Sequence, residues 1–239
     1  MNFNLQPRNM TTETTTRPPE LLAALRRLTG DEKHELASQS TLDVLWVLYD
    51  RVLRVDPHWP DDPDRDRFLL SKGHGPAAYY AVLATKGFFP LDWLDDMGGP
   101  DSRLGYHPDR LLVPGVEISS GSLGHGLGLA VGTALGLRAQ GRTGSHVYVL
   151  VGDAELDEGS NHEAIAYAGA TGLDNLTTIV IDNQSATHGW AGGIASRFTV
   201  NGWAAQDVDG RDHDAITAAL LHRAEPRPHV IVAHVEPKS

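Results

Sequence analysis

Apolar residues along the chain form two kinds of pattern, short continuous runs and longer repeats at helical spacing. The runs HVYVLV and TTIVI, in residues 146–151 and 176–182, are typical of strands that are buried on both faces. A helical pattern separates them, over residues 157–170. Because strands and helices alternate, we predict an α/β fold, a doubly wound and mostly parallel sheet with helices on both faces. The other predicted elements are helices near residues 20–28, 41–53, 76–87, 121–140 and 215–224, and a last strand at 229–235.

The segments between these elements indicate one domain. Residues 1–19 are polar, rich in threonine and free of apolar periodicity, so we expect a disordered tail before a single domain at 20–239. Residues 90–115 contain many Pro, Gly and Asp residues and predict a long loop. Another loop is expected to run from the strand at 176–182 to about Phe198.

Composition narrows the classes of protein that remain. The 239 residues, 41% of them hydrophobic, are enough for one large α/β domain. The net charge of −11 argues against a nucleic acid or an anionic membrane as the main partner, although a bound metal can still attract a phosphorylated ligand. The absence of cysteine excludes disulfides, thiolate metal sites and cysteine nucleophiles. No apolar segment typical of a secretory signal begins the chain, so we expect a cytoplasmic protein.

Several common functional motifs are absent from the sequence. The chain has neither a G-x-x-x-x-G-K-[ST] phosphate loop nor a G-x-G-x-x-G dinucleotide fingerprint after a strand. Two His-Glu pairs lack the second histidine of a zinc site, because Ser38 and Ala166 occupy its position. There is no G-x-S-x-G nucleophile elbow. The run DVDGRDHD suggests a calcium loop but lacks the EF-hand spacing and the final Glu, so we expect a structural turn there.

Oxygen-bearing side chains follow two neighbouring strands of the predicted sheet. Asp153 comes directly after the strand at 146–151, and Asn183 after the strand at 176–182. Ligands of open parallel sheets bind beyond the carboxyl ends of the strands, and hard oxygens suit Mg²⁺ or Ca²⁺ together with phosphate oxygens of a ligand. The helix at 157–170 would direct its positive end to the same place. Spacing alone leaves open that both residues belong to ordinary turns and helix caps.

Longer stretches of the sequence carry a family resemblance. GDAELDEGSNHEA…LDNLTTIVIDN resembles the thiamine-diphosphate motif, which opens with Gly-Asp-Gly and closes on an Asn. The segments DRDRFLLSKGHGPAAYYAVLATKGFF, GYHPD, VPGVEISSGSLGHGLGLAVGTALG and RFTVNGW…VDGRDHDAI are similar to successive segments of transketolases. The likeness covers roughly residues 40–235, in order. The chain therefore resembles the transketolase family in its diphosphate-binding (PP) domain.

The resemblance implies a metal and diphosphate site around the strand ends. Asp153, Asn183 and, by spacing, Ser185 match the positions that hold the divalent metal, Mg²⁺ or Ca²⁺. Gly152 and Ala154 belong to the same cofactor-binding motif, although Ala154 replaces its second Gly. A methyl group there would crowd the backbone if the residue needed a positive φ.

The resemblance also assigns catalytic and further cofactor-binding residues. His74 matches a histidine that contacts the diphosphate and lines the site, and Gly121 and Leu123 match positions around the aminopyrimidine. His107 matches a histidine that contacts the donor's hydroxyl and the covalent intermediate. Glu158 matches a glutamate that reaches across the dimer to the catalytic Glu of the partner domain. Without the resemblance, the histidines would be ordinary loop residues and Glu158 a carboxylate favoured by the helix dipole.

The implied activity is transfer of a two-carbon ketol unit from a ketose or 2-oxo acid donor to an acceptor. The likeness covers the diphosphate half only, so we expect a split enzyme whose pyrimidine domain is a separate C-terminal transketolase-like subunit, in an α2β2 heterotetramer. Alone, the chain should be inactive. The sequence departs from the family at three further places. Residues 38–40 lack the family's Ser-Gly-His-x-Gly, and His125 stands where Gln is frequent. The sequence ends at VEPKS, before the segment that carries a further cofactor-facing His in the family. These departures argue against ordinary pentose phosphate substrates.

Two other functions stay open at this point. The α subunit of a 2-oxo acid dehydrogenase has the same kind of thiamine-diphosphate motif, although the Ser-Lys-Gly-His and Gly-x-Leu-Gly-His-Gly segments fit that class less well. A non-catalytic relic that binds a partner without cofactor is the alternative from a different class. Cofactor binding with and without the partner would separate these.

Overall fold

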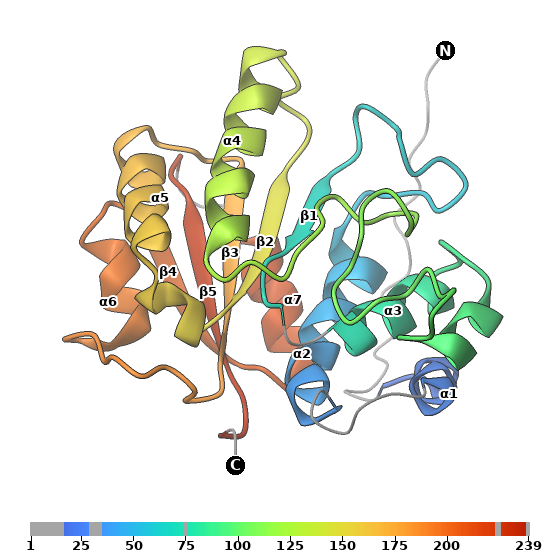
Figure 1. Ribbon diagram of the computed structural model, residues 1–239. Coiled ribbons are helices and arrows are strands. Elements are labelled where there is room, and N and C mark those ends of the chain that lie inside the picture. Colours follow the sequence, from blue (N-terminus) through green and yellow to red (C-terminus); the bar gives the residue numbers. More distant parts are fainter. Residues whose placement is uncertain (1–16, 29–34, 74–75, 223–225, 238–239) are drawn as a thin grey trace.

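A five-stranded parallel sheet forms the centre of the protein (Figure 1). The computed structural model describes residues 17–28, 35–73, 76–222 and 226–237. Within them the strands follow the order β1-β2-β3-β5-β4, and every pair is parallel. Their bounds are Arg67–Leu70 for β1, Val147–Gly152 for β2, Leu176–Asp182 for β3, Ala204–Asp209 for β4 and His229–His234 for β5.

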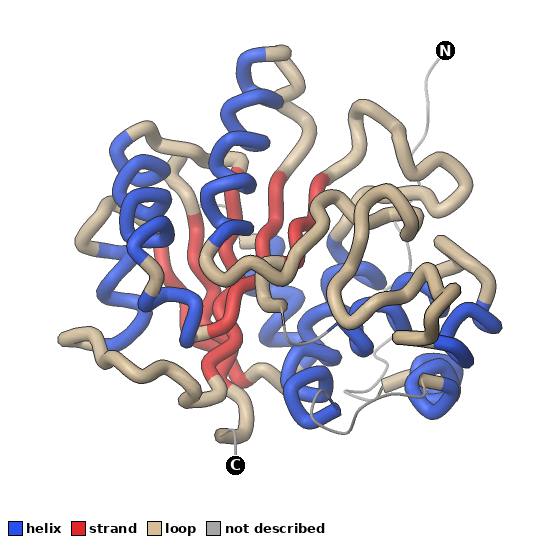
Figure 2. Tube along the Cα trace, in the orientation of Figure 1, coloured by secondary structure: helices blue, strands red, loops and turns tan. Residues whose placement is uncertain are grey.

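Helices cover both faces of this sheet (Figures 1 and 2). On one face α2, α3 and α7 share a hydrophobic core with the strands, and α1 packs against α3; on the other face α4, α5 and α6 share the core. The helices are α1 Pro19–Arg27, α2 Glu35–Val47, α3 Pro76–Thr85, α4 His125–Ala139, α5 Gly159–Ala170, α6 Gly193–Thr199 and α7 His213–Leu221. The predicted doubly wound α/β fold is therefore confirmed.

The central strands show why the sequence folds in this way. Successive side chains of a strand point to opposite faces, so Tyr148 and Leu150 of β2 join one core while Val147, Val149 and Val151 join the other. All residues of β2 are buried. Burying one such Val or Leu side chain contributes about 1.5–3 kcal/mol, which explains the continuous apolar runs seen in the sequence.

Three elements differ from the expectations. The loop expected to reach Phe198 contains α6, a helix of 7 residues that begins at Gly193; its cap Gly192 and Gly193 itself both have a positive φ. The strand β4 lies at the sheet edge and is only partly buried, so its sequence AAQDVD contains no apolar run. The strand β1 has 4 residues, too few for a periodic signal.

The remaining boundaries shift by a few residues. The second helix starts at Glu35 and continues as a π-helix over Leu48–Val52. Residues 91–96 of the expected long loop form a 3₁₀-helix. Residues 1–16 of the expected tail lie outside the described residues, and the side chain of Arg17 donates a hydrogen bond to Asp43. In the described part of the chain, no helix combines the length and the apolar character needed to cross a bilayer.

Candidate functional site

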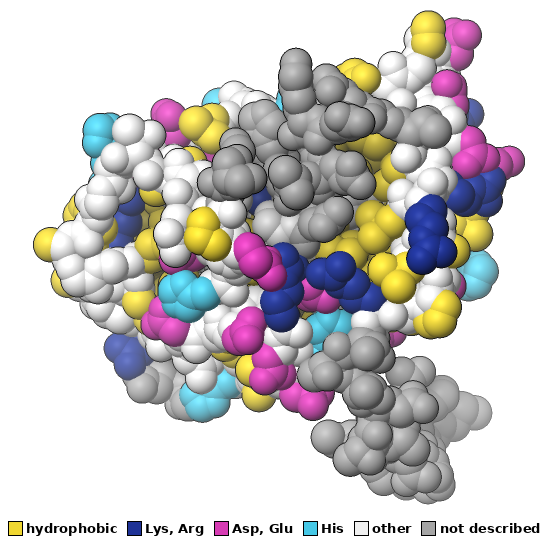
Figure 3. All heavy atoms as spheres, turned by 90° about the horizontal axis from the view of Figure 1, so that it is seen from below, with side chains coloured by type: hydrophobic (Ala, Val, Ile, Leu, Met, Phe, Trp, Pro, Cys, Tyr) yellow, Lys and Arg dark blue, Asp and Glu magenta, His cyan; other side chains and the backbone are white. Residues whose placement is uncertain are grey.

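The ends of β2 and β3 bring the two predicted metal ligands to one edge of the sheet. Gly152 lies opposite Ile181 in the register, and the N–H of Asp153 donates to the carbonyl of Ile181 at 3.1 Å. Asp153 and Asn183, the residues after the two strands, are 2% and 4% exposed. Figure 3 looks onto this end of the molecule, where acidic, basic and histidine side chains lie together. The expected neighbourhood is thus present, while metal binding itself stays a prediction.

The carboxylate of Asp153 organises the loop that follows β3. Its Oδ1 accepts hydrogen bonds from the Ala154 N–H at 2.9 Å and from the Ser185 hydroxyl at 2.6 Å. Its Oδ2 accepts from the N–H groups of Ser185 and Ala186, at 2.6 and 3.2 Å. Ser185, which was expected near the metal, therefore contacts Asp153 directly.

Asn183 is buried next to a strained turn. Its side-chain oxygen Oδ1 has no hydrogen-bond partner among the described residues. The next residue, Gln184, has a φ of 57°, the only positive φ of a non-glycine residue in the described ranges. Such a backbone is unfavourable for a residue with a Cβ, and outliers of this kind cluster at functional sites.

Ala154 causes no backbone strain. It is the first residue of a short 3₁₀-helix, Ala154–Asp157, and its φ is not positive. The crowding expected for a methyl group at a positive φ therefore does not arise. An alanine is compatible with the backbone of this motif.

A second group of site residues surrounds His107. Its Nδ1 lies 3.1 Å from the Gly73 carbonyl, so Nδ1 carries the hydrogen and donates it. Gly121 has a φ of 119°, and a Cβ there would come within 2.8 Å of the His107 ring. Both the positive φ and the short distance to the His107 ring therefore favour glycine at position 121. His74 follows Gly73 in the chain and lies outside the described residues.

Leu123 and Glu158 lie where α4 begins. Leu123 is 53% exposed, which is unusual for a large apolar side chain. Gly124 caps α4 with a φ of 77°, and a Cβ on it would come within 2.6 Å of the Glu158 Cβ. The Ser160 hydroxyl donates to the Gly124 carbonyl at 2.9 Å. Both predicted residues therefore stand at one corner of the molecule, with exposed side chains.

A buried carboxylate that sequence reasoning missed connects these groups. Oε1 of Glu155 accepts from the Ser71 hydroxyl at 2.7 Å and from the Gly124 N–H at 3.2 Å, and Oε2 accepts from the Gly152 N–H at 2.9 Å. Burial raises the pKa of the Glu155 carboxyl, against the effect of these hydrogen bonds. One side chain therefore joins the segments that lead to His74, Leu123 and Asp153.

The loop after β3 also covers a cavity of about 430 Å³. Asp153 and Asp157 form part of its wall, and the Asp157 carboxylate accepts the N–H groups of Thr187 and His188 at 3.2 and 3.1 Å. Two carboxylates thus hold residues 185–188. No group of three or more His, Cys, Asp or Glu side chains in the described ranges could hold a metal ion. A metal here would need the Asn183 amide, backbone oxygens and phosphate oxygens besides Asp153.

The expected structural turn lies in the middle of the run DVDGRDHD, at residues 210–212, between the end of β4 and the start of α7. Asp209 accepts the Arg211 N–H at 2.8 Å, and Asp212 caps α7 by accepting from Asp214 and Ala215 at 3.0 and 2.9 Å. Asp209 and Asp212 thus accept hydrogen bonds within the turn, while Asp207 pairs with His234 and Asp214 with Arg51.

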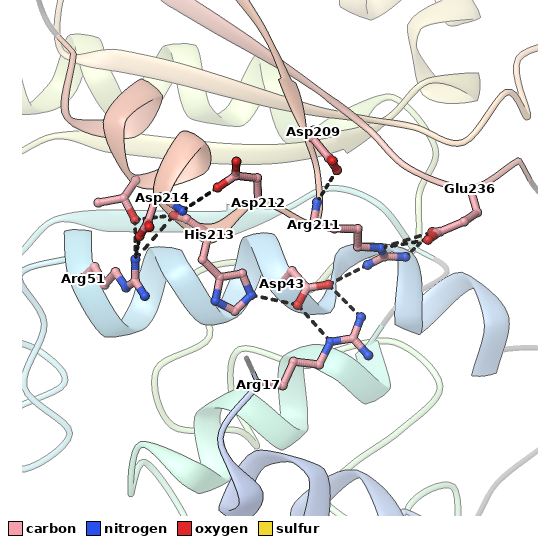
Figure 4. Close-up of polar contacts among 10 residues, drawn as sticks. Arg17, Asp43, Arg51, Asp209, Arg211, Asp212, His213, Asp214 and Glu236 are labelled. Carbon is pink, nitrogen blue, oxygen red and sulfur yellow. Dashed lines mark hydrogen bonds and ion pairs between the residues drawn. The ribbon is translucent and has the colours of Figure 1, made fainter. Parts of the chain in front are cut away.

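The same turn anchors α2 and both ends of the described chain (Figure 4). The buried carboxylate of Asp43 accepts from Arg17 at 2.7 Å, from Arg211 at 2.7 Å and from His213 Nε2 at 2.9 Å. Arg211 also pairs with Glu236. Burial would raise the pKa of Asp43, but the hydrogen bonds from Arg17 and His213 outweigh it, and the pKa falls well below its ordinary value.

Comparisons with known proteins agree with this geometry. The family described as "Transketolase, thiamine diphosphate binding domain" matches residues 29–235. The chain is 55% identical over 220 residues to "Ferredoxin fas2" of Rhodococcoides fascians, covering 92% of this chain and 72% of that protein. It is 36% identical over 222 residues to "6-deoxy-6-sulfo-D-fructose transketolase subunit SqwG" of Clostridium sp. (strain MSTE9), covering 87% and 80%. It is 38% identical over 208 residues to an apulose-4-phosphate transketolase subunit of Actinobacillus succinogenes, covering 84% and 75%.

Solved structures give the same result for the fold. The transketolase from Leishmania mexicana superposes with a TM-score of 0.73 at 26% identity, covering 90% of this chain and 36% of that one. The transketolase from Campylobacter jejuni gives 0.71 at 27% identity, covering 92% and 38%. The chain thus spans little more than a third of the length of these two solved transketolases.

Proposed function

Since the chain belongs to the transketolase family, through its thiamine-diphosphate-binding domain, we propose that it is the diphosphate-binding subunit of a split transketolase-like enzyme. Residues 20–239 form the cofactor-binding domain. A separate subunit with the pyrimidine domain completes the active site, in an α2β2 assembly. Together they transfer a two-carbon ketol unit from a ketose or 2-oxo acid donor to an acceptor. Relatives named as transketolase subunits, of which the chain covers 75% and 80%, support the split architecture.

The observation that carries this proposal is the unpartnered oxygen of Asn183 beside Asp153. Buried polar atoms are almost always hydrogen-bonded, and an exception needs an explanation such as an ion. Asn183 Oδ1 is such an exception, and a carboxylate, an amide and the Ser185 carbonyl are hard ligands that fit Mg²⁺ or Ca²⁺. The bound metal would neutralise the diphosphate, which explains how a protein of net charge −11 binds an anionic cofactor.

The other cofactor-binding residues fit the organic part of the cofactor. Gly152 and Ala154 flank Asp153 without steric conflict, and Gly121 provides a surface that a side chain would fill. Leu123 offers an exposed apolar side chain for the aminopyrimidine. On the family resemblance alone, we assign His74 to the diphosphate. The cofactor, when bound, supplies the carbon nucleophile and the electron sink of the reaction.

His107 is the proposed proton carrier on this chain. Its Nδ1–H donates to the Gly73 carbonyl, and this bond fixes both the ring orientation and the tautomer. Nε2 then has a lone pair that accepts the hydrogen of a donor hydroxyl. A histidine is suited to this role because it gains and loses a proton near neutral pH.

Glu158 is the proposed link to the partner subunit. It is exposed, next to the start of α4, and no partner residue binds its carboxylate in the described part of the chain. We assign it to the contact with the catalytic glutamate of the pyrimidine domain.

The experiment is a reconstitution. Calorimetry would measure binding of thiamine diphosphate with Mg²⁺ to the full chain, with and without a candidate subunit that carries the pyrimidine domain. We expect binding that strengthens with the partner, and ketol transfer by the mixture but not by this chain alone. Ketol transfer by the single chain would contradict the split enzyme, and cofactor binding in neither condition would favour a non-catalytic relic.

A further inference from the structure

The carboxylate of Asp153 has no unused acceptor position. A carboxylate offers about four lone pairs. Two hydrogen bonds reach Oδ1 and two reach Oδ2, from Ala154, Ser185 and Ala186. Asn183 Oδ1, by contrast, accepts no hydrogen bond from the described residues. Of the two proposed side-chain ligands, Asn183 therefore has a free oxygen for the metal, whereas both oxygens of Asp153 already accept hydrogen bonds.

One of the four donors to Asp153 can leave without moving the backbone. Three of them are main-chain N–H groups, whose positions depend on the chain around them. The fourth is the Ser185 hydroxyl, 2.6 Å from Oδ1, and a hydroxyl turns away by rotation of its side chain. Its hydrogen also places a positive end next to one of the two carboxylate oxygens available to a cation.

We propose that the Ser185 hydroxyl is a latch on the metal ligand Asp153. Without the cation it donates to Oδ1 and holds the loop in place, and the cation must displace it to bind. This inference rests on the proposed function, and it concerns the side chain of Ser185 rather than its carbonyl. Ser185 is thus a positioning residue that lowers metal affinity in return for an ordered loop.

The test compares Ser185→Ala with the wild-type chain. Mg²⁺ is titrated by calorimetry into the full chain, with the pyrimidine-domain partner present and thiamine diphosphate saturating. Because the variant removes a competing hydrogen bond to a charged group, we expect Mg²⁺ to bind about tenfold tighter, or about 1.4 kcal/mol. In the absence of metal, amide hydrogen exchange at residues 185 and 186 should be faster than in the wild type.

Two further variants make the comparison specific. Ser196→Ala removes a hydroxyl that donates to Ala191 and Gly193 at the far end of the loop, and it should leave Mg²⁺ affinity unchanged. Ser185→Cys provides a weaker donor and should shift affinity in the same direction if the alanine variant does not fold.

The outcomes separate the latch from the proposed function. Equal or weaker Mg²⁺ binding by Ser185→Ala would overturn the latch, and weaker binding would make the hydroxyl itself a metal ligand. A wild-type chain that binds no Mg²⁺ with cofactor and partner would overturn both the latch and the metal site.

Discussion

Replacing Glu155 by Gln should loosen the site without changing the shape of the side chain. Glu155 accepts three hydrogen bonds on two oxygens. A glutamine has one oxygen and an NH₂ group. If the oxygen stays near Gly152, the NH₂ group faces the N–H of Gly124. If it is reversed, the NH₂ group faces the N–H of Gly152. One buried main-chain donor is left without an acceptor in either orientation.

The magnitude follows from that orphaned donor. A buried N–H without a partner costs about 1–3 kcal/mol. The neutral side chain avoids part of the cost of burying a charge, which is the cause of the raised pKa of Glu155. We therefore expect a net loss of about 2 kcal/mol in the free energy of unfolding. For a chain of this size, this lowers the melting temperature by about 4–8 °C.

Thermal unfolding followed by circular dichroism measures this loss, and calorimetry measures the affinity for thiamine diphosphate with Mg²⁺. Affinity should fall together with stability, because Glu155 holds three segments of the site. Glu163→Gln is the matched control, since Glu163 is exposed on α5, and it should change stability by less than about 0.5 kcal/mol. A Glu155→Gln variant with wild-type stability and affinity would refute the connecting role of this carboxylate.

Three other changes test separate parts of the structure. Asp43→Asn leaves Arg17, Arg211 and His213 without their shared carboxylate and should lower the free energy of unfolding by about 2–4 kcal/mol in urea denaturation; a loss below about 1 kcal/mol would contradict the cluster. Burial, with His222 nearby, lowers the pKa of His229 to about 4 from 6.5, so the folded state binds fewer protons in this window and stability falls as pH drops from 6.5 to 4, by about 3 kcal/mol. His229→Leu should remove this slope, and an unchanged slope would assign it to other groups. Gly121→Ala would place a Cβ within 2.8 Å of the His107 ring and should lower kcat of the assembled enzyme at least about tenfold, whereas retained activity would show that this contact relaxes.

The part of the fold that could be predicted is the part in which burial dominates the sequence. The strands β2 and β3 lie at the centre of the sheet, and each is an unbroken apolar run. The strand β4 was not predicted because it lies at the sheet edge and is only partly buried. Polar residues such as Gln206 and Asp207 are tolerated there, so no apolar run marks the strand. The helix α6 is too short for helical periodicity to show.

The site was predictable where it depends on strand ends and not where it depends on contacts across the chain. Asp153 and Asn183 follow apolar runs, so their shared edge could be expected. Glu155 stands two residues after Asp153 and looks like any acidic residue of a short helix. Its contact with Ser71 joins positions 84 residues apart, and one sequence contains no signal for such a pair.

Ion pairs around Asp43 connect the two ends of the described chain without a covalent bond. Arg17, near its beginning, and Glu236, near its end, are joined through Asp43 and Arg211. In a protein without cysteine, these ion pairs form a non-covalent cross-link between distant parts of the chain, a role that a disulfide has in other proteins. If Arg17 detaches, Asp43 loses one partner, and Arg211, one of its remaining partners, is the residue that binds Glu236. The two ends should therefore fray as one unit, so that a truncation before α1 would raise hydrogen exchange in β5.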